Sequence, residues 1–278
     1  MKNFNEVKDF LVRMALAEDV GPGDITTKAL IDEGCRTKAE IKAKQKGVIA
    51  GLAVAKEVFH RVDPRIAFTA KVKDGKEVKK GTVIATLAGS ARGILTGERT
   101  ALNFLQHLSG IATLTGEFVA RVKGQGARII DTRKTTPGLR VLEKYAVKMG
   151  GGENHRMGLY DAILIKDNHI KIMGGAKKAL EGLGRQRRLK AVEVEARTLS
   201  EVQTAISAGV GRILLDNMDI KTLRRAVKLC KKAKVKTEAS GGVNLSNVRA
   251  IAKTGVDYIS IGALTHSAPA LDISLKIV

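Results

Sequence analysis

Short apolar runs, each ending in or beside a polar residue, alternate with helical patterns through the second half of this chain. The runs occupy 127–131, 162–166, 191–195, 212–216, 235–238 and 257–261. Helical periodicity fills 199–208, 220–233 and 245–254 between the later runs. Strands that alternate with helices in this way predict βαβ units and a parallel sheet. Six such units favour a barrel over an open sheet, and the pattern alone leaves open whether the barrel closes.

The ends of these runs carry charges of both signs. The end residues are Asp131, Lys166, Glu195, Asp216 and Glu238, with Ser260 near the end of the last run. In a β/α barrel the active site lies at the carboxyl ends of the strands. One charged strand end would need no explanation beyond contact with solvent. Five of them, of both signs, favour a functional site at this edge of the sheet.

The segment KMGGGENHRMGLYDAILIKDNHI, residues 148–170, brings several cations close to one strand end. Lys166 ends an apolar run, and lysine is almost never fully buried without a partner. His155 and Arg156 precede it, while Arg133 and Lys134 follow the first strand. Arginine grips carboxylate or phosphate with two donors, and lysine acts as a compact charge. These residues predict a pocket for an anion that carries several negative groups.

A long helix is expected over 97–122, where Leu102, Leu105 and Leu108 have helical spacing. Arg99 would lie in its first turn, where a cation faces an unfavourable helix dipole. A surface position is one interpretation of this arginine, and a role as an anion ligand is the other. Arg99 therefore joins the candidate anion-binding residues.

Two acidic run ends, Glu195 and Asp216, face these cations in the predicted barrel. They could hold Mg²⁺ or ribose hydroxyls, or stabilise a developing cation. They could equally pair with the lysines, because buried charges are usually paired.

The last two βα units each contain a glycine turn. The two turns are Ser240-Gly241-Gly242 and Ile261-Gly262-Ala263. Glycine lets backbone N–H groups approach an anion, and barrels often bind phosphate at this pair of loops. The turns are therefore a candidate phosphate site.

The residues before the long helix have a different pattern. An amphipathic helix is expected over 1–20, and strands are expected over 38–48 and 66–87. Asp74-Gly75 and Lys80-Gly81 mark turns within the second of these stretches.

The formal net charge of +21 permits two interpretations, a polyanionic partner or a solvated basic surface. With six Phe, three Tyr and no Trp, the chain poorly supplies a platform for stacking bases, so nucleic acid is not expected as the main partner. No apolar run approaches 18 residues, so no membrane span is expected. Cys35 and Cys230 have no metal-binding spacing, and a reduced, cytoplasmic compartment is expected.

Seven segments together resemble the quinolinate phosphoribosyltransferase family, the decarboxylating nicotinate-nucleotide pyrophosphorylases. They are AEDVGPGDITT (17–27), GERTALNFLQHLSGIAT (97–113), DTRKTTPGLR (131–140), KYAVKMGGGENHRMGLYDAILIKDNH (144–169), VEVE (192–195), ILLDNM (213–218) and EASGGV (238–243). The resemblance covers nearly the whole chain, in order. No departure is visible at the matched charged positions.

The resemblance implies an α/β fold with two domains. An N-terminal α/β sandwich domain would span 1–112 and be joined by a C-terminal tail of 268–278. An incomplete TIM-like α/β barrel would span 113–267. The family forms homodimers in which an arginine, here Arg99, reaches the neighbouring subunit's site.

The resemblance also implies the reaction. Quinolinate and phosphoribosyl pyrophosphate, with Mg²⁺, would give nicotinate mononucleotide, pyrophosphate and CO₂ in de novo NAD biosynthesis. After the ring nitrogen attacks the anomeric carbon, the new pyridinium would act as an electron sink for loss of the adjacent carboxylate.

The resemblance assigns roles to individual residues. Quinolinate would be bound by Arg99, Arg133, His155, Arg156 and Lys166, with Thr132 in the same substrate-binding segment. Lys134 and Lys166 would neutralise the departing pyrophosphate. Glu195 and Asp216 would hold ribose hydroxyls or Mg²⁺. Ser240, Gly241, Gly242, Ile261, Gly262 and Ala263 would bind the 5′-phosphate.

A related phosphoribosyltransferase of different specificity remains the main alternative. Its substrate could be nicotinate, without decarboxylation, or that of a molybdenum-transport-associated paralogue. A monocarboxylate should not need Arg99, Arg133 and Arg156 together, which favours quinolinate.

Overall fold

The computed structural model describes residues 4–184 and 191–278 and divides the chain into two compact units. The first unit contains Met1–Gly116, Lys134–Gly151 and Ala263–Val278. The second contains Glu117–Arg133 and Gly152–Gly262. No helix among the described residues is long and apolar enough to cross a membrane.

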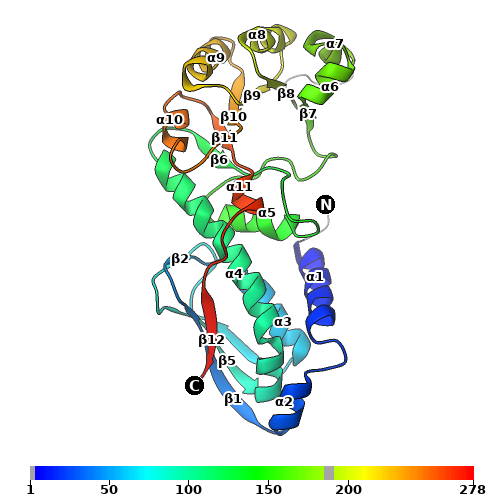
Figure 1. Ribbon diagram of the computed structural model, residues 1–278, viewed down its shortest axis with the longest axis vertical. Coiled ribbons are helices and arrows are strands. Elements are labelled where there is room, and N and C mark those ends of the chain that lie inside the picture. Colours follow the sequence, from blue (N-terminus) through cyan, green and yellow to red (C-terminus); the bar gives the residue numbers. More distant parts are fainter. Residues whose placement is uncertain (1–3, 185–190) are drawn as a thin grey trace. The chain divides into compact units, whose positions relative to one another are not determined.

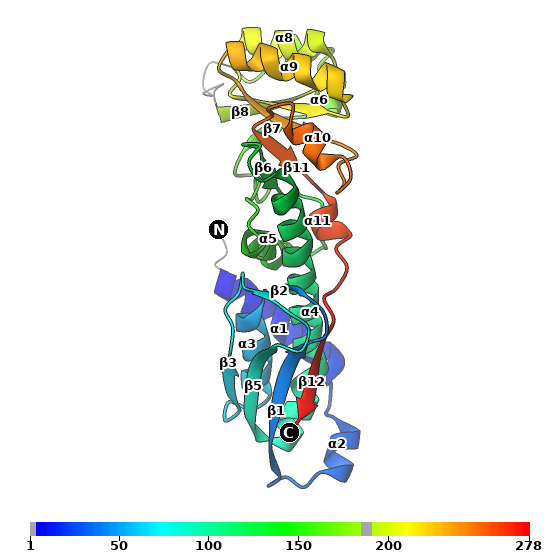
Figure 2. The same cartoon turned by 90° about the vertical axis from the view of Figure 1, so that its left-hand side faces the viewer.

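The first unit is built on a four-stranded antiparallel sheet of order β12-β1-β5-β3, seen face-on in Figure 2. Its strands are β1 (Arg36–Ala43), β3 (Ala67–Ala70), β5 (Val83–Ser90) and β12 (Ile273–Ile277). Alternate residues of β1, namely Ala39, Ile41 and Ala43, are buried, as expected for a strand with one face against a core. The C-terminal strand β12 pairs with β1, so the last residues of the chain complete this sheet.

Helices supply the rest of this unit's core. They are α1 (Phe4–Asp19), α2 (Ile25–Leu30), α3 (Leu52–Val62), the first part of α4 (Ala91–Val122), α5 (Arg140–Met149) and α11 (Ala263–His266). Helix α1 packs against α3. In α4 the side chains of Leu102, Leu105 and Leu108 are buried, which confirms the predicted helical spacing.

Two strand predictions in this unit need correction. The strand expected over 38–48 breaks after Ala43 and resumes as the two-residue strand β2 (Gly47–Val48). The stretch expected over 66–87 contains three strands: β3, β4 (Glu77–Val78), which pairs with β2, and β5. Gly75 and Gly81 have positive φ angles of 83° and 87°, which confirms the predicted turns that separate these strands.

The second unit contains a six-stranded, all-parallel sheet of order β6-β11-β10-β9-β8-β7, whose strands are labelled in Figure 1. The strands are β6 (Arg128–Ile130), β7 (Ile163–Ile165), β8 (Val192–Ala196), β9 (Arg212–Asp216), β10 (Lys236–Ser240) and β11 (Tyr258–Ser260). The helices between them are α6 (Asp167–Ile172), α7 (Ala176–Glu181), α8 (Leu199–Ala208), α9 (Ile220–Lys232) and α10 (Val248–Ala252). The sequence-based prediction of six βα strands is therefore confirmed.

The ring of strands is open between β6 and β7, which follow one another in the chain but form the two sheet edges among the described residues. A bridge from Glu153 partly covers the β6 edge. The Glu153 N–H donates to the Ile129 carbonyl at 2.9 Å, and the Asp131 N–H donates to the Glu153 carbonyl at 3.2 Å. The predicted incomplete barrel is confirmed.

The strand register separates an apolar face from a polar one. Side chains that are paired across parallel strands point to the same face. On one face lie Val192, Val194, Ile213, Leu215, Ala239 and Ile259. The opposite face, the barrel interior, carries Glu193 beside Arg212, and Glu238 beside Tyr258.

Two expected element limits are wrong in ways that affect the site. Helix α4 begins at Ala91, so Arg99 lies more than two turns inside the helix and the argument from the helix dipole no longer applies. Strand β10 continues to Ser240, where it pairs with Asp216, so Glu238 lies within the strand and not at its end.

Candidate active site

Three of the predicted site residues meet at the carboxyl ends of β7, β8 and β9. Lys166 is exposed directly after the buried pair Leu164 and Ile165, while Glu195 ends the run of β8 and Asp216 ends β9. Burial raises the pKa of Glu195, and the negative charges of Asp216 and Asp167 raise it further. Arg197 and Lys166 act in the opposite direction. These five side chains, Lys166, Asp167, Glu195, Arg197 and Asp216, are defined here as the rim cluster.

The sequence-based prediction missed two rim residues, Asp167 and the arginine that contacts it, Arg197. Its guanidinium lies 3.1 Å from Asp167 Oδ2, 3.5 Å from Glu195 Oε1 and 3.1 Å from Asp216 Oδ2. The sequence could have indicated Arg197, because alternate side chains of a strand share a face and Glu193, Glu195 and Arg197 are two residues apart.

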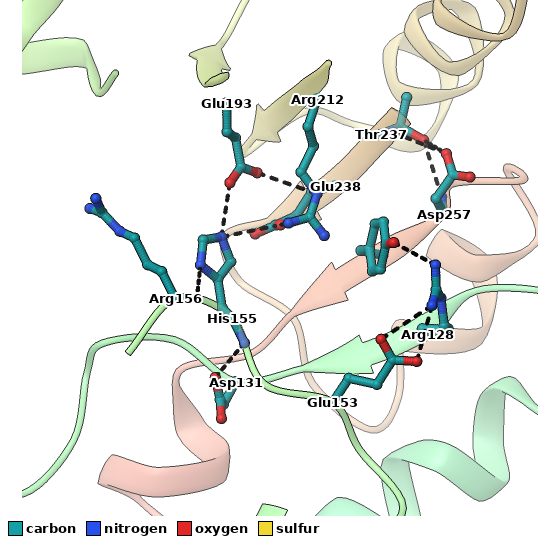
Figure 3. Close-up of polar contacts among 11 residues, drawn as sticks. Arg128, Asp131, Glu153, His155, Arg156, Glu193, Arg212, Thr237, Glu238 and Asp257 are labelled. Carbon is teal, nitrogen blue, oxygen red and sulfur yellow. Dashed lines mark hydrogen bonds and ion pairs between the residues drawn. The ribbon is translucent and has the colours of Figure 1, made fainter. Parts of the chain in front are cut away.

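A second group of charges lies inside the barrel, where His155 meets two glutamates (Figure 3). His155 Nε2 lies 2.9 Å from Glu193 Oε2 and 3.5 Å from Glu238 Oε2. Arg212 approaches the same carboxylates at 3.7 and 3.5 Å. We call His155, Glu193, Arg212 and Glu238 the interior cluster.

Burial inside the interior cluster favours the protonated form of Glu238. Its side chain is 1% exposed, and burial is the main cause that raises its pKa to about 8. The charge of Glu193 adds to this rise, whereas the charge of Arg212 opposes it. The pKa of Glu193 is also raised by burial, with Arg212 the leading opposing charge.

The backbone fixes the tautomer of His155. The Arg156 N–H donates to His155 Nδ1 at 2.7 Å, so Nδ1 is the unprotonated acceptor. The proton is then on Nε2, which donates to Glu193. In this arrangement His155 is a neutral ring directed at carboxylates.

Asp131 anchors the segment that carries this histidine. It is fully buried, accepts from the His155 N–H at 2.9 Å, and accepts from Asn154 Nδ2 at 2.5 Å. Asp131 was predicted as a charged strand end. The structure accounts for this buried carboxylate by its hydrogen bonds to the loop that carries His155.

Arg156 and Arg133 are two positively charged side chains that repel each other. Burial is the main cause that lowers the pKa of Arg156, and repulsion by Arg133 lowers it further. Arg156 lines a cavity of about 440 Å³ that His155, Glu193, Arg212, Lys236 and Tyr258 also line. An anion between the two arginines would relieve their repulsion.

Tyr258 forms part of this cavity between two cations. The guanidinium carbons of Arg212 and Arg128 lie 3.9 and 4.4 Å from its ring centroid. Arg128 also donates to the Tyr258 hydroxyl, and it donates to Glu153 as Figure 3 shows. Such cation–π contacts stabilise positive charge inside the barrel.

The two glycine turns differ in their backbone conformation and hydrogen bonding. Gly241 and Gly242 have positive φ angles of 93° and 60°. A Cβ on Gly241 would lie 2.2 Å from Asn217 Oδ1, so only glycine fits there. In the second turn the Ile261 N–H already donates to the Ile130 carbonyl at 3.0 Å, and Ala263 begins α11.

The remaining predicted residues lie at exposed or intermediate positions. Arg99 and Lys134 are exposed in the first unit, where the Lys134 carbonyl accepts from the Thr265 hydroxyl at 2.7 Å. Thr132 is partly buried after β6 in the second unit.

Two places offer carboxylates to a metal ion. Among the described residues, His155, Glu193 and Glu238 have ligand atoms within 4.8 Å of one another. However, a protonated Nε2 has no lone pair to give to a metal ion. The rim carboxylates Glu195 and Asp216 fit better, because Mg²⁺ prefers oxygen ligands and commonly binds through one or two carboxylates plus substrate phosphates.

The fold and the site together define a β/α-barrel enzyme with paired cations for an anionic substrate and an acidic rim at its strand ends. The model of the quinolinate phosphoribosyl transferase C-terminal domain matches residues 111–276, and that of the N-terminal domain matches 24–109. The chain belongs to the quinolinate phosphoribosyltransferase family.

Relatives and solved structures agree with this membership. A probable nicotinate-nucleotide pyrophosphorylase [carboxylating] of Synechocystis is 48% identical, with 95% of this chain and 90% of the relative covered. One from Bacillus subtilis is 48% identical, with 94% and 90% covered. The solved nicotinate-nucleotide pyrophosphorylase of Francisella tularensis has a TM-score of 0.93 and 41% identity, with 99% and 97% covered.

Proposed function

We propose that this protein transfers the phosphoribosyl group of phosphoribosyl pyrophosphate to quinolinate and releases CO₂. The products would be nicotinate mononucleotide and pyrophosphate, in de novo NAD biosynthesis. Relatives named as quinolinate phosphoribosyltransferases or nicotinate-nucleotide pyrophosphorylases support this assignment. The structural observation that carries it is the repelling pair Arg133 and Arg156, because a substrate with two adjacent carboxylates matches two crowded guanidinium groups.

The cations of the site would bind and orient quinolinate. Arg133 and Arg156 would each take a carboxylate, and Lys166 would add a third positive charge at the strand ends. His155 would act through Arg156, since its Nδ1 already fixes the Arg156 backbone N–H. Thr132 would contribute to the same substrate-binding segment.

The rim carboxylates would act on the ribose. Glu195 and Asp216 lie where they can hold ribose hydroxyls or Mg²⁺, and their charge would stabilise the oxocarbenium-like state as the diphosphate departs. Mg²⁺, when bound, supplies positive charge to the departing diphosphate. Lys134 and Lys166 would neutralise the same group. Ser240, Gly241, Gly242, Ile261, Gly262 and Ala263 would form the 5′-phosphate site.

Decarboxylation would need little from acid–base groups. Once the ring nitrogen is bonded to the sugar, the bond to the adjacent carboxylate would break and CO₂ would leave. The electron pair would stay on the ring carbon, stabilised by the neighbouring pyridinium nitrogen, and a proton from solvent would then bond to that carbon. Positioning and electrostatics then supply most of the effect. We assign the catalytic roles to Lys134, Lys166, Glu195 and Asp216.

The assembly and location belong to the same proposal. The active form would be a homodimer in which Arg99 enters the neighbouring subunit's site, consistent with its exposed position on α4. The N-terminal sandwich domain would span 1–112 with the tail 268–278, and the barrel would span 113–267. The compartment would be the cytoplasm, where cysteines such as Cys35 and Cys230 remain reduced.

A substrate-binding assay tests the proposal at Arg133. The Arg133→Ala variant should lose most of its quinolinate affinity while its circular dichroism spectrum and melting temperature stay near those of the parent. The matched control is Arg224→Ala on the exposed face of α9, which should bind quinolinate normally. Unchanged quinolinate affinity in Arg133→Ala would refute the assignment.

A further inference from the structure

The position of Arg197 between three carboxylates gives it a part in metal loading. Its Nη1, Nη2 and Nε each face a different acid, respectively Asp167, Glu195 and Asp216. The acids are well covered, with exposed side-chain fractions of 28%, 10% and 14%. One guanidinium therefore contacts three carboxylates that otherwise repel one another.

The negative charges need such a partner. Glu195 and Asp216 lie on the neighbouring strands β8 and β9, and Asp167 begins α6, so three carboxylates converge on one guanidinium. Asp167 also lies 3.9 Å from Lys171 Nζ, but no ion pair joins Lys166 to the three acids in the part of the chain that the structure describes. Arg197 is therefore the counter-ion that all three acids share.

Arg197 occupies the oxygens that a divalent cation would use. Glu195 Oε1 and Asp216 Oδ2 are hard oxygen donors of the kind that Mg²⁺ prefers. A guanidinium and a metal ion cannot both contact the same two oxygens without strong like-charge repulsion. The metal and Arg197 are thus competitors for the rim.

The Arg197 side chain can move away from the three acids without becoming buried at another place. This side chain is 51% exposed, and Arg197 follows β8 at the point where α8 has not yet begun. A guanidinium also pairs well with phosphate oxygens, with which it forms two parallel hydrogen bonds. A diphosphate that arrives with the metal would give the displaced guanidinium a new partner.

We propose that Arg197 is an exchangeable counter-ion: it holds Asp167, Glu195 and Asp216 until a metal–diphosphate substrate arrives, then transfers to the diphosphate. The proposal rests on the proposed function for the identity of that substrate. It assigns Arg197 a positioning and loading role that links metal binding to diphosphate binding. The consequence is that each of the two ligands strengthens the binding of the other.

The test measures Mn²⁺ binding to the full-length protein by electron paramagnetic resonance, at pH 8 without any substrate. Arg197→Gln should bind Mn²⁺ about three- to tenfold more tightly than the parent, a size set by a half-exposed ion-pair network. Adding Asp216→Asn to Arg197→Gln should abolish the gain. Arg224→Gln, an exposed arginine on α9, is the matched control and should leave Mn²⁺ affinity unchanged.

Substrate binding supplies the second readout. Arg197→Gln should raise the KM for phosphoribosyl pyrophosphate and reduce the coupling between Mn²⁺ and this substrate, while Arg197→Lys should restore part of both. Unchanged or weaker Mn²⁺ binding by Arg197→Gln, or no detectable binding by either protein, would overturn the proposal. Because Mn²⁺ affinity is measured without turnover, such a result is distinct from an absence of activity with quinolinate.

Discussion

Replacement of Glu238 by glutamine should change how stability depends on pH, because the carboxyl is buried inside the barrel. Its folded-state pKa is about 8, above the ordinary value of 4.5. Between these values the unfolded chain releases the proton while the folded protein retains it, so folding loses stability as pH rises through this window. Each pKa unit corresponds to about 1.4 kcal/mol, so the full loss is on the order of a few kcal/mol.

Glu238→Gln removes this loss, since glutamine keeps the shape and stays neutral. The free energy of unfolding, measured by urea at several pH values from 5 to 9, should show the variant gaining on the parent as pH rises and levelling off above pH 8. Glu181→Gln is the control, because Glu181 is exposed on α7 and its pairing is weak. A difference that stays flat, or that favours the parent at high pH, would refute the conclusion that Glu238 is protonated.

Three further predictions address packing, backbone strain and assembly. Leu108→Ala should lower the unfolding free energy by about 2–5 kcal/mol, because Leu108 is 1% exposed in α4, whereas Met14→Ala at an exposed position of α1 should have little effect in the same urea titration. Gly241→Ala should lower the free energy of unfolding by at least about 1–3 kcal/mol, because φ is 93° and the new Cβ would meet Asn217. In calorimetry the control Gly34→Ala, which has open space around it, should unfold at the same temperature as the parent. Arg99→Ala and Lys166→Ala should each be inactive, yet mixing them should restore some turnover through hybrid dimers; no recovery after verified subunit exchange would count against a shared site.

Local patterns in the sequence predicted much of the fold. Helix α8 and strand β9 have the predicted limits, because a capping box starts α8 and β9 is a clean apolar run. The limits of β10 were harder to predict. Thr237, Glu238 and Ala239 form a buried stretch whose middle residue is a glutamate, and its partners Glu193 and Arg212 lie on other strands.

The sequence predicted site residues only where a charged residue stands at the end of a strand. Lys166, Glu195 and Asp216 were found in this way and do interact at the rim. The neutral state of His155 was beyond prediction, because it depends on the Arg156 N–H that its own ring accepts. The exposed position of Lys166 also removes the argument that its burial required an anion.

Arg197 shows what a charge pattern alone omits. It follows the acidic strand β8 by one residue and could be taken for a solvated surface arginine. Only the arrangement of three strands and the start of α6 brings Asp167, Glu195 and Asp216 to its guanidinium.

The most direct test of the central claim is a measurement of CO₂ and nicotinate mononucleotide released by the purified protein. The reaction would contain phosphoribosyl pyrophosphate and Mg²⁺ with either quinolinate or, in parallel, nicotinate. We predict that quinolinate is consumed with equal release of CO₂ and nicotinate mononucleotide, and that nicotinate is not. Turnover of nicotinate alone, or of neither substrate, would contradict the assignment of this barrel to quinolinate.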